Sequence, residues 1–438
     1  MNSEEITAYM EEAAARGIVP GLSATEALLD ALGHPEERLR FVHIAGTNGK
    51  GSVLAYLTTV LQEAGYKVGA FFSPALNDPW EKIRVGGRPI TEKAVGHALT
   101  ILKERGVSGT VFETECALAL WYFARCKCDI AVLECGMGGE ADATNVIPAP
   151  ELCVFTPIDM DHMQYLGNSL SRIAAAKAGI IKTGSTVVTA SQEAEALAEL
   201  RKKAGKTKVI EAKTPTDVRY GLYEQHFNCA GYRDLMIRLA GTWQIKNAAL
   251  AVTALECLKK RGFDIPEEAL RKGLAETVWD GRFTVLRKKP LFLMDGAHNE
   301  AAVRVLKESL ETYLPGERFV MILGVLKDKA YEKELRMLLP LAVHLITLTP
   351  PENARALPAL DLAETAQEIA EEAGLDLSIT AADSVEEATE IALLLSGGKL
   401  PVLATGSLSW IGRLRGTLKR RPGGSASPFS GKGPGIVV

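Results

Sequence analysis

The stretch His43-Ile-Ala-Gly-Thr-Asn-Gly-Lys-Gly-Ser-Val53 decides how the rest of this chain is interpreted. It follows the apolar residues Phe41 and Val42 and leads into residues 54–61, an apolar segment that predicts a helix. Glycines let the backbone approach a ligand closely, and the N–H groups at the start of a helix point at phosphate oxygens. Lys50 would reach the outer phosphates, and the Ser52 hydroxyl would meet a Mg²⁺ ion. The segment predicts nucleotide binding; an ordinary glycine-rich turn is the alternative.

Composition limits the kind of protein that this chain can be. Its 438 residues are too many for one ordinary core, so two or three domains are expected. The net charge of −4 gives no bulk attraction to nucleic acid or to an anionic membrane. Seven cysteines without metal-binding spacing suit reduced thiols. No apolar run approaches the roughly 18 residues of a membrane span. We therefore expect a cytoplasmic protein without nucleic-acid or membrane partners.

Strand-like and helix-like segments alternate over the first half of the chain, which predicts a mainly parallel sheet covered by helices on both faces. The predicted strands are Tyr66–Phe72, Ile130–Leu133, Leu152–Thr156 and Thr186–Ala190, and the predicted helices include Glu115–Ala124 and Ser171–Ala178. Residues 208–240 hold short strands without a helix between them, so we expect an antiparallel edge or a small sheet there. A helix is predicted over 246–260.

The segment Pro266–Lys289 changes character and is interpreted as the interdomain linker. A second α/β series follows, with strands predicted at Leu291–Met294, Phe319–Leu323, Val343–Thr347 and Pro401–Ala404, and helices at 300–312, 329–338, 361–373 and 384–396. The predicted fold class is thus α/β, with a P-loop-type N-terminal domain over residues 1–285 and a smaller Rossmann-like domain over 286–421. Residues 422–438, rich in Gly, Ser and Pro, are predicted to be a disordered tail.

Three predicted strands of the first domain end in polar side chains. Glu134 follows an apolar strand and precedes a glycine-rich turn, and Ser73 and the group Asp159–His162 follow two others. Side chains at the carboxyl ends of parallel strands meet in the crevice where α/β sheets bind ligands, and hard oxygen ligands suit Mg²⁺. The alternatives are a solvated acid for Glu134, a structural residue for His162 and a simple Ser-Pro turn for Ser73.

Lys177 lies among small apolar neighbours in a predicted helix. If that helix packs on the sheet, desolvation lowers the lysine pKa and favours the neutral amine. A neutral amine can react with CO₂ to give a carbamate, which is an oxygen ligand for Mg²⁺. On the residues alone, a lysine that extends its ammonium to solvent is the preferred interpretation.

Three residues of the second half complete the candidate site. Asp295 and His298 follow the strand Leu291–Met294, and Arg282 lies in the linker loop. Asp295 would bind a ribose or a water, His298 a phosphate or acyl-phosphate oxygen, and Arg282 the γ-phosphate. A helix N-cap for Asp295 and a surface loop for Arg282 are the alternatives. Together the three suggest ATP held between two domains.

In this order the motifs resemble the folylpolyglutamate synthase/dihydrofolate synthase family of the Mur ligase superfamily. The resemblance extends from Gly21 to about Arg415. Its most specific motifs are Ala-Gly-Thr-Asn-Gly-Lys-Gly-Ser at 45–52 and Asp-Gly-Ala-His-Asn at 295–299. It departs at Ala75, where the family usually has His, and at Glu140, where an Arg is common.

The resemblance implies a Mur-ligase-type ATP-binding domain, a C-terminal glutamate-ligase domain and a role for each candidate residue. It assigns Thr47, Asn48, Gly49, Lys50, Gly51, Ser52, Asn247, Arg282 and Asp295 to ATP. It assigns Ser52, Ser73, Glu134, His162 and a carbamylated Lys177 to two Mg²⁺ ions. Thr110, Val111, Phe112 and Glu113 would hold the pterin end of the acceptor, and Lys50, Lys177, Arg282 and His298 would be catalytic.

The reaction that the resemblance implies is the ATP-dependent addition of L-glutamate to dihydropteroate, to a reduced folyl-(poly)glutamate, or to both, through an acyl phosphate. A synthase restricted to folylpolyglutamates and a Mur-type ligase with another acceptor are the enzymatic alternatives. The non-enzymatic alternative is a nucleotide-binding switch that has lost catalysis. A monomer acting on small molecules is expected.

Overall fold

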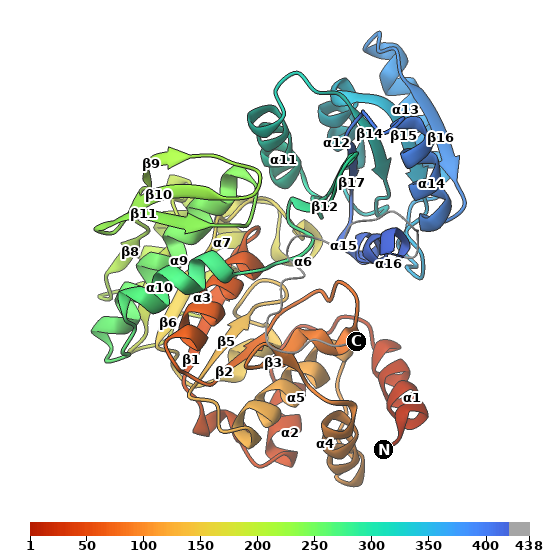
Figure 1. Cartoon of the computed structure of the whole chain (residues 1–438). Coiled ribbons are helices and arrows are strands. Elements are labelled where there is room, and N and C mark those ends of the chain that lie inside the picture. Colours follow the sequence, from red (N-terminus) through yellow and green to blue (C-terminus); the bar gives the residue numbers. More distant parts are fainter. Residues whose placement is uncertain (420–438) are drawn as a thin grey trace. The chain divides into compact units, whose positions relative to one another are not determined.

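The computed structural model describes residues 1–419, and the predicted tail at 422–438 lies outside them. The chain forms two compact units (Figure 1). The first comprises residues 1–219, 224–238 and 244–278, and the second comprises 220–223, 239–243 and the residues from Trp279 onward. The predicted boundary between 285 and 286 stays a prediction. Among the described residues, no helix combines the length and the apolar character needed to cross a bilayer.

The first unit is built on an eight-stranded sheet of order β4-β3-β2-β5-β1-β6-β7-β8. Its strands are β1 (Phe41–Ala45), β2 (Val68–Phe71), β3 (Ile83–Val85), β4 (Arg88–Pro89), β5 (Ile130–Glu134), β6 (Leu152–Phe155), β7 (Thr186–Thr189) and β8 (Val209–Glu211). All neighbours from β2 to β8 are parallel, whereas β3 and β4 add an antiparallel edge. The predicted mainly parallel sheet is confirmed.

The register of the central strands determines where the site can form. In the parallel pairs, Ile44 of β1 lies opposite Glu134 of β5, and Ala45 lies opposite Phe155 of β6. Phe71 of β2 is in turn opposite Leu133 of β5. Four strands therefore end at one level, and the loops that follow them leave the sheet at the same edge.

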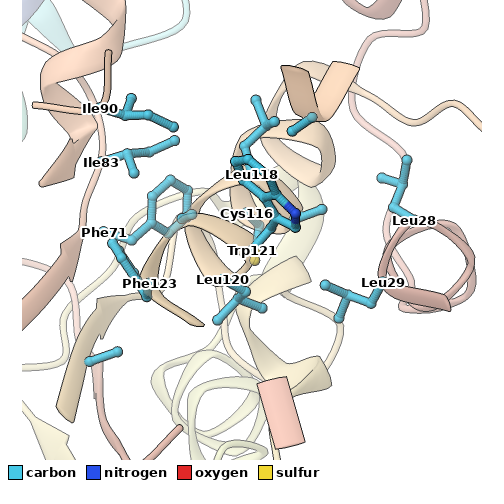
Figure 2. Close-up of a cluster of buried hydrophobic side chains, with 14 of the residues drawn as sticks. Leu28, Leu29, Phe71, Ile83, Ile90, Cys116, Leu118, Leu120, Trp121 and Phe123 are labelled. Carbon is cyan, nitrogen blue, oxygen red and sulfur yellow. The ribbon is translucent and has the colours of Figure 1, made fainter. Parts of the chain in front are cut away.

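Helices cover both faces of this sheet. They are α1 (Ser3–Ala14), α2 (Ser23–Ala31), α3 (Lys50–Glu63), α4 (Glu92–Glu104), α5 (Val111–Arg125), α6 (Met163–Leu166), α7 (Leu170–Ala178), α8 (Ala194–Ala204), α9 (Thr242–Lys260) and α10 (Glu267–Glu276), with 3₁₀ turns η1 (Pro35–Arg38), η2 (Pro79–Lys82) and η3 (Ala143–Val146). On one face α2, α4 and α5 enclose an apolar cluster, and Figure 2 shows Phe71 and Phe123 within it. Phe123 packs on β2 because Gly69 carries no side chain: a Cβ there would lie 2.6 Å from the ring.

The segment 208–240 contains the predicted small sheet and one strand of the large one. Strands β9 (Thr216–Arg219), β10 (Gln225–Cys229) and β11 (Tyr232–Ile237) form an antiparallel sheet. Strand β8 instead pairs in parallel with β7 and ends the large sheet. The predicted helix over 246–260 begins four residues earlier, as α9 at Thr242.

The second unit contains a six-stranded sheet of order β12-β13-β17-β14-β15-β16. Its strands are β12 (Thr284–Lys288), β13 (Leu291–Met294), β14 (Phe319–Leu323), β15 (Ala342–Leu348), β16 (Ser378–Ala382) and β17 (Val402–Thr405). Its helices are α11 (Glu300–Tyr313), α12 (Tyr331–Leu338), α13 (Ala359–Glu372), α14 (Val385–Leu395), α15 (Leu408–Ile411) and α16 (Arg413–Lys419), with the 3₁₀ turn η4 (Leu339–Leu341). Every pair is parallel except β12 with β13.

Two edge strands of this unit were not predicted. The segment Pro266–Lys289, which we interpreted as the linker, contains β12. In this strand Val285 and Leu286 are buried, while Arg287 and Lys288 remain partly or fully accessible. Strand β16 is short and largely accessible. Edge strands of this kind carry few apolar residues, so the hydrophobic pattern that reveals central strands is weak there.

Candidate active site

The loop between β1 and α3 approaches its surroundings too closely for side chains. At Gly46, with φ 145°, a Cβ would lie 1.9 Å from the Thr156 hydroxyl oxygen at the end of β6. At Gly49, with φ 93°, a Cβ would lie 2.7 Å from the Asn247 amide oxygen on α9. The loop is also tied to the segment after β6, because Thr47 and Asp159 exchange two hydrogen bonds. The loop backbone is therefore held in place up to the start of α3, and the N–H groups at a helix start favour an anion.

Lys50, the first residue of α3, turns back over this loop. Its Nζ donates to the carbonyl oxygens of Gly46 and Thr47, each at 3.1 Å. It also lies 3.9 Å from a carboxylate oxygen of Glu134 at the end of β5. The structure thus brings together the two charged groups that the sequence placed at separate strand ends.

Lys177 reaches the same loop from α7. Its side chain is buried, and its Nζ donates to the Gly46 carbonyl at 2.9 Å, the oxygen that also accepts from Lys50. Burial, and then the charge of Lys50, lower the pKa of Lys177 to about 7. A substantial fraction of the amine is therefore neutral near pH 7, which is the form that can add CO₂.

Ser52 and Asn247 are joined by a residue to which the sequence gave no role. Gln244 is fully buried at the start of α9; its Nε2 donates to the Ser52 hydroxyl at 3.1 Å, and its Oε1 accepts from the Asn247 amide at 3.2 Å. Ser52 and Gln244 lie 192 positions apart in the chain. Neither composition nor motif spacing indicates such a pairing, so only the fold reveals it.

The other predicted metal ligands lie in loops at the same edge of the sheet. Glu134 is buried at the end of β5. Ser73 is partly buried just after β2, where the Ser73–Pro74 peptide bond is cis. His162, with φ 51°, precedes α6 and keeps a side chain that is 40% exposed, with its Nε2 3.9 Å from Asp161.

The glycine-rich turn after Glu134 lies between three parts of the candidate site. A Cβ at Gly136 would lie 2.6 Å from the Phe112 ring, and one at Gly139 would lie 2.6 Å from the Lys177 carbonyl. Asp142, which sequence reasoning did not select, accepts hydrogen bonds from the N–H groups of Met137 and Thr144. The turn therefore holds Phe112 and the end of α7 at fixed positions relative to Glu134.

The predicted acceptor-binding segment Thr110–Glu113 starts α5. Thr110 and Glu113 form a reciprocal capping box, in which each side chain accepts from the backbone N–H of the other. Val111 is the first helical residue. The Phe112 ring is partly exposed, and its centroid lies 5.5 Å from that of Phe71. Two of the four residues thus build the helix start, and Phe112 offers a ring face.

The two positions that depart from the family pattern lie close to this site in the sequence. The loop that contains Ala75 is folded on itself, because Glu81 accepts from the N–H groups of Leu76 and Asn77. Glu140 is exposed, and its backbone packs against α7, since a Cβ at Gly179 would lie 2.3 Å from the Glu140 Cβ.

In the second unit, Asp295 organises the loop that carries Arg282. Its buried carboxylate accepts from the N–H groups of Phe283 at 2.7 Å and Ala297 at 2.8 Å. Burial raises the pKa of Asp295, and the nearby Arg282 acts in the opposite direction. The helix N-cap interpretation of Asp295 was wrong, because Asn299 caps α11.

Arg282 and His298 lie on either side of Gly296. The Arg282 guanidinium would be 2.8 Å from a Cβ at Gly296, so it extends along that backbone. The His298 Nδ1 lies 2.7 Å from the Gly296 carbonyl oxygen, which can only accept. The proton of a neutral His298 is therefore on Nδ1, and its Nε2 carries a lone pair.

Comparisons with known proteins give the family of this chain. Residues 44–255 match the Mur ligase middle domain, and residues 281–408 match the Mur ligase glutamate ligase domain. The dihydrofolate synthase/folylpolyglutamate synthase of Bacillus subtilis is 36% identical, over 92% of this chain and 96% of the relative.

Solved structures extend the likeness to three dimensions. Mycobacterium tuberculosis folylpolyglutamate synthase complexed with ADP is 28% identical, with a TM-score of 0.85 over 96% of this chain and 100% of that one. Escherichia coli FolC in complex with DHPP and ADP is 28% identical, with a TM-score of 0.82 over 95% and 97%. The chain belongs to the dihydrofolate synthase/folylpolyglutamate synthase family, as the sequence predicted.

The side chains at the sheet edge fit a magnesium nucleotide. Gly46 and Gly49 leave no space for side chains, so the loop backbone packs closely against Thr156 and Asn247 and leads into the start of α3, where helix N–H groups favour an anion. A carboxylate from Glu134 and a hydroxyl from Ser52, both buried, are the hard oxygen donors that Mg²⁺ prefers.

Proposed function

We propose that this protein is an ATP-dependent ligase that joins the amine of L-glutamate to a carboxylate of dihydropteroate, of a reduced folyl-(poly)glutamate, or of both. The observation that carries the proposal is the loop Gly46–Gly49, whose first and last positions have room only for glycine. Lys50 lies beside this loop, and Glu134 is 3.9 Å from the lysine. The family to which the chain belongs, and the ADP bound in two of its structural relatives, support this choice.

The proposed reaction has two steps. The acceptor carboxylate attacks the γ-phosphate, which gives an acyl phosphate and ADP. The glutamate amine then attacks the acyl carbon, the amide bond forms, and inorganic phosphate leaves with the bridging oxygen of the original carboxylate. Positive charge around the transferring phosphoryl group lowers the barrier of the first step.

The nucleotide is proposed to bind through residues of both units. The proposed contacts are Thr47, Asn48, Gly49, Lys50, Gly51, Ser52 and Asn247 from the first unit and Arg282 and Asp295 from the second. Lys50 neutralises charge on the outer phosphates, and Arg282 does so at the γ-phosphate. His298, with a lone pair on Nε2, accepts a hydrogen bond from the reacting groups or, when protonated, binds a phosphate oxygen.

Two Mg²⁺ ions are proposed to be held by Ser52, Ser73, Glu134, His162 and Lys177, with Lys177 as a carbamate. When bound, these ions supply charge neutralisation at the phosphates. Carbamylation converts an ammonium into an oxygen ligand, and the burial that lowers the pKa of Lys177 to about 7 favours the amine that reacts with CO₂.

The carbamate can be tested by carbon-13 NMR of protein equilibrated with labelled bicarbonate. We expect one protein-bound carbamate resonance, which disappears in Lys177→Met. Lys182 is a matched control, because burial also lowers its pKa while its Nζ donates to the Asn145 and Ile147 carbonyls. The resonance should persist in Lys182→Met. Its persistence in Lys177→Met, or its absence from the wild type, would refute the assignment.

The acceptor is proposed to bind with its pterin ring on Phe112, beside Thr110, Val111 and Glu113. A synthase for folylpolyglutamates alone, or a Mur-type ligase with another acceptor, would share the ATP chemistry; Ala75 and Glu140 are the residues that favour a changed acceptor.

We further infer a cytoplasmic monomer that acts on small molecules, without nucleic-acid or membrane partners.

Product analysis decides among these enzymes. The wild type is incubated with ATP, Mg²⁺, L-glutamate and, in parallel, dihydropteroate, tetrahydrofolate or a diglutamylated folate. Mass spectrometry should detect the gain of a glutamyl residue, with equal amounts of phosphate released. Products from folyl acceptors alone would favour the restricted synthase. Nucleotide binding without product from any acceptor would contradict the proposed reaction.

A further inference from the structure

The amide of Gln244 links the two sides of the candidate nucleotide loop. One end contacts the Ser52 hydroxyl on the first turn of α3, and the other contacts Asn247. Asn247 in turn lies against Gly49, where its amide oxygen occupies the space that a side chain would need. Gln244, Ser52 and Asn247 are all buried. The two amide groups of Gln244 and Asn247 together therefore connect the Ser52 hydroxyl to the loop backbone at Gly49.

This contact restricts what the Ser52 hydroxyl can do. A serine oxygen has two lone pairs and one proton, and its hydroxyl rotates unless a neighbour fixes it. The amide N–H of Gln244 occupies one lone pair, which leaves the second for another partner. Gln244 cannot rotate away, because Asn247 holds its far end inside a buried region where unpaired amides are costly.

We propose that Gln244 is a positioning residue that orients the Ser52 hydroxyl for the divalent cation accompanying the nucleotide. The inference rests on the proposed function, since it assumes that Ser52 meets Mg²⁺. The proposed role acts through the contact of Gln244 with Ser52 and not through a contact of Gln244 with nucleotide or acceptor. Residues that orient metal ligands typically change metal affinity by tenfold to a hundredfold when they are replaced.

The test measures nucleotide binding with and without the cation. Titration calorimetry with a non-hydrolysable ATP analogue is carried out in EDTA and at increasing Mg²⁺ concentrations, on wild type and Gln244→Met. In EDTA, the loss of the acceptor for Asn247 should weaken binding of the analogue to Gln244→Met by no more than a few-fold, about what one neutral hydrogen bond contributes. The Mg²⁺ concentration that gives half of the affinity gain should rise by about tenfold or more. A merely structural role would weaken both measurements equally.

A second variant and a double-mutant cycle keep the test decisive if Gln244→Met is poorly folded. Gln244→Leu is uncharged and, like Gln244→Met, can neither donate to Ser52 nor accept from Asn247. It should show the same raised Mg²⁺ requirement. In a Ser52→Ala background, replacing Gln244 should change the Mg²⁺ requirement less than twofold, because the two residues act on one contact.

Thr58→Val is the matched control. Thr58 is also buried on α3, but its hydroxyl donates only to carbonyls of its own helix, those of Leu54 and Ala55. This variant should match wild type in EDTA and in Mg²⁺. If wild type gains affinity from Mg²⁺ and both Gln244 variants gain it equally, the inference about Gln244 is refuted while the proposed function stands. If wild type does not bind the analogue at all, the proposed function fails.

Discussion

Lys50 and Lys177 donate hydrogen bonds to the same carbonyl oxygen, that of Gly46. Two positive charges therefore meet at one point of the loop. Lys177 is buried there, and its pKa falls to about 7, with burial as the main cause and Lys50 as the second. Lys50 lies 3.9 Å from a carboxylate oxygen of Glu134. The shared carbonyl of Gly46 thus keeps Lys50 close enough to contribute to the lowered pKa of Lys177.

Replacing Lys50 should abolish ligation without unfolding the protein. A positive group on the transferring phosphate contributes about 10³-fold or more to such reactions. The Lys50 ammonium donates to two carbonyls of its own loop and lies 3.9 Å from the Glu134 carboxylate. Within the described residues 1–419 it has no hydrogen bond to the rest of the core, so Lys50→Ala should keep the thermal unfolding midpoint close to wild type. Phosphate release should fall more than about a thousandfold. Lys93→Ala, which removes an exposed lysine of α4, is the control, and near-normal turnover of Lys50→Ala would disprove the role.

His43 should make the protein less stable in acid. Burial, followed by the charge of Lys182, lowers the pKa of His43 from 6.5 to about 3. Between these values the unfolded chain takes up a proton that the folded protein excludes, so the free energy of unfolding falls as the pH drops below 6.5. His43→Gln retains an amide donor for Thr144 but cannot titrate. The stability advantage of wild type over His43→Gln should therefore shrink by roughly 2 kcal/mol between pH 7 and pH 5.

Urea unfolding at the two pH values measures this difference. His97→Gln, which replaces an exposed histidine on α4, should reproduce the pH profile of wild type. Parallel pH profiles for wild type and His43→Gln would show that the buried imidazole has no part in acid stability.

Sequence reasoning found the residues whose chemistry is visible in short motifs, and it missed those that act over long separations. Lys50, Glu134 and Lys177 stand in recognisable segments. Gln244 meets Ser52 only because the start of α9 lies beside the first turn of α3, although the two residues are far apart along the chain. Asp142 gains its role because it receives N–H groups from a turn that the sequence shows only as glycine-rich.

At the scale of elements, the loop before α3 requires glycine at position 49 for two reasons. One is the backbone conformation, and the other is the close approach of a neighbouring side chain. Gly49 and Gly65 provide a matched comparison, with φ of 93° and 91°. A Cβ at Gly49 would lie 2.7 Å from Asn247, whereas a Cβ at Gly65 meets nothing within 4 Å. Substitution at either costs backbone strain of about 1 kcal/mol or more, but only Gly49→Ala must also displace a neighbour of the site.

Gly49→Ala should therefore weaken ATP binding by tens-fold, while Gly65→Ala should leave it within about twofold of wild type. Both variants should lose stability of the order of 1 kcal/mol. Titration calorimetry and urea unfolding check the two expectations separately. Equal ATP affinities in the two variants would show that close approach at Gly49 is irrelevant to the nucleotide.

The sequence predicts the central strands of the sheets more accurately than the edge strands. Strands β13 and β14 have the predicted bounds, because each is a short apolar run with turn residues beside it. The edge strands β12 and β16 were missed, since polar residues serve well where one side of a strand is open. Strand β8 was expected in an antiparallel edge or a small sheet, but three residues carry too little pattern to indicate which sheet they join and in which direction.

At the scale of the whole molecule, the candidate residues are divided between the two units, with Arg282, Asp295 and His298 in the second and the others in the first. The alternation of strands and helices predicted two α/β parts, and the structure contains one mainly parallel sheet in each unit. The sequence did not predict that residues 220–223 and 239–243 belong to the second unit. These short segments lie between elements of the first unit, so nothing in their composition marks them as different.

If residues of both units serve one nucleotide, a change in the second unit alone must reduce turnover. Arg282→Ala should lower kcat by about a hundredfold to a thousandfold at saturating ATP, because it removes a positive charge from the γ-phosphate. Arg304→Ala removes an arginine that pairs with Glu300 on the surface of α11 and is the control. Steady-state phosphate release measures both. A normal kcat for Arg282→Ala would exclude the second unit's arginine from the reaction.

The most direct test follows oxygen from the acceptor to the phosphate. The acceptor is prepared with oxygen-18 in its reacting carboxylate and is turned over with ATP, Mg²⁺ and L-glutamate. Attack of the carboxylate on the γ-phosphate predicts one labelled oxygen in the released phosphate for each amide bond formed. Unlabelled phosphate alongside the amide, or ATP consumption without any amide, would contradict the acyl-phosphate ligase proposed for this chain.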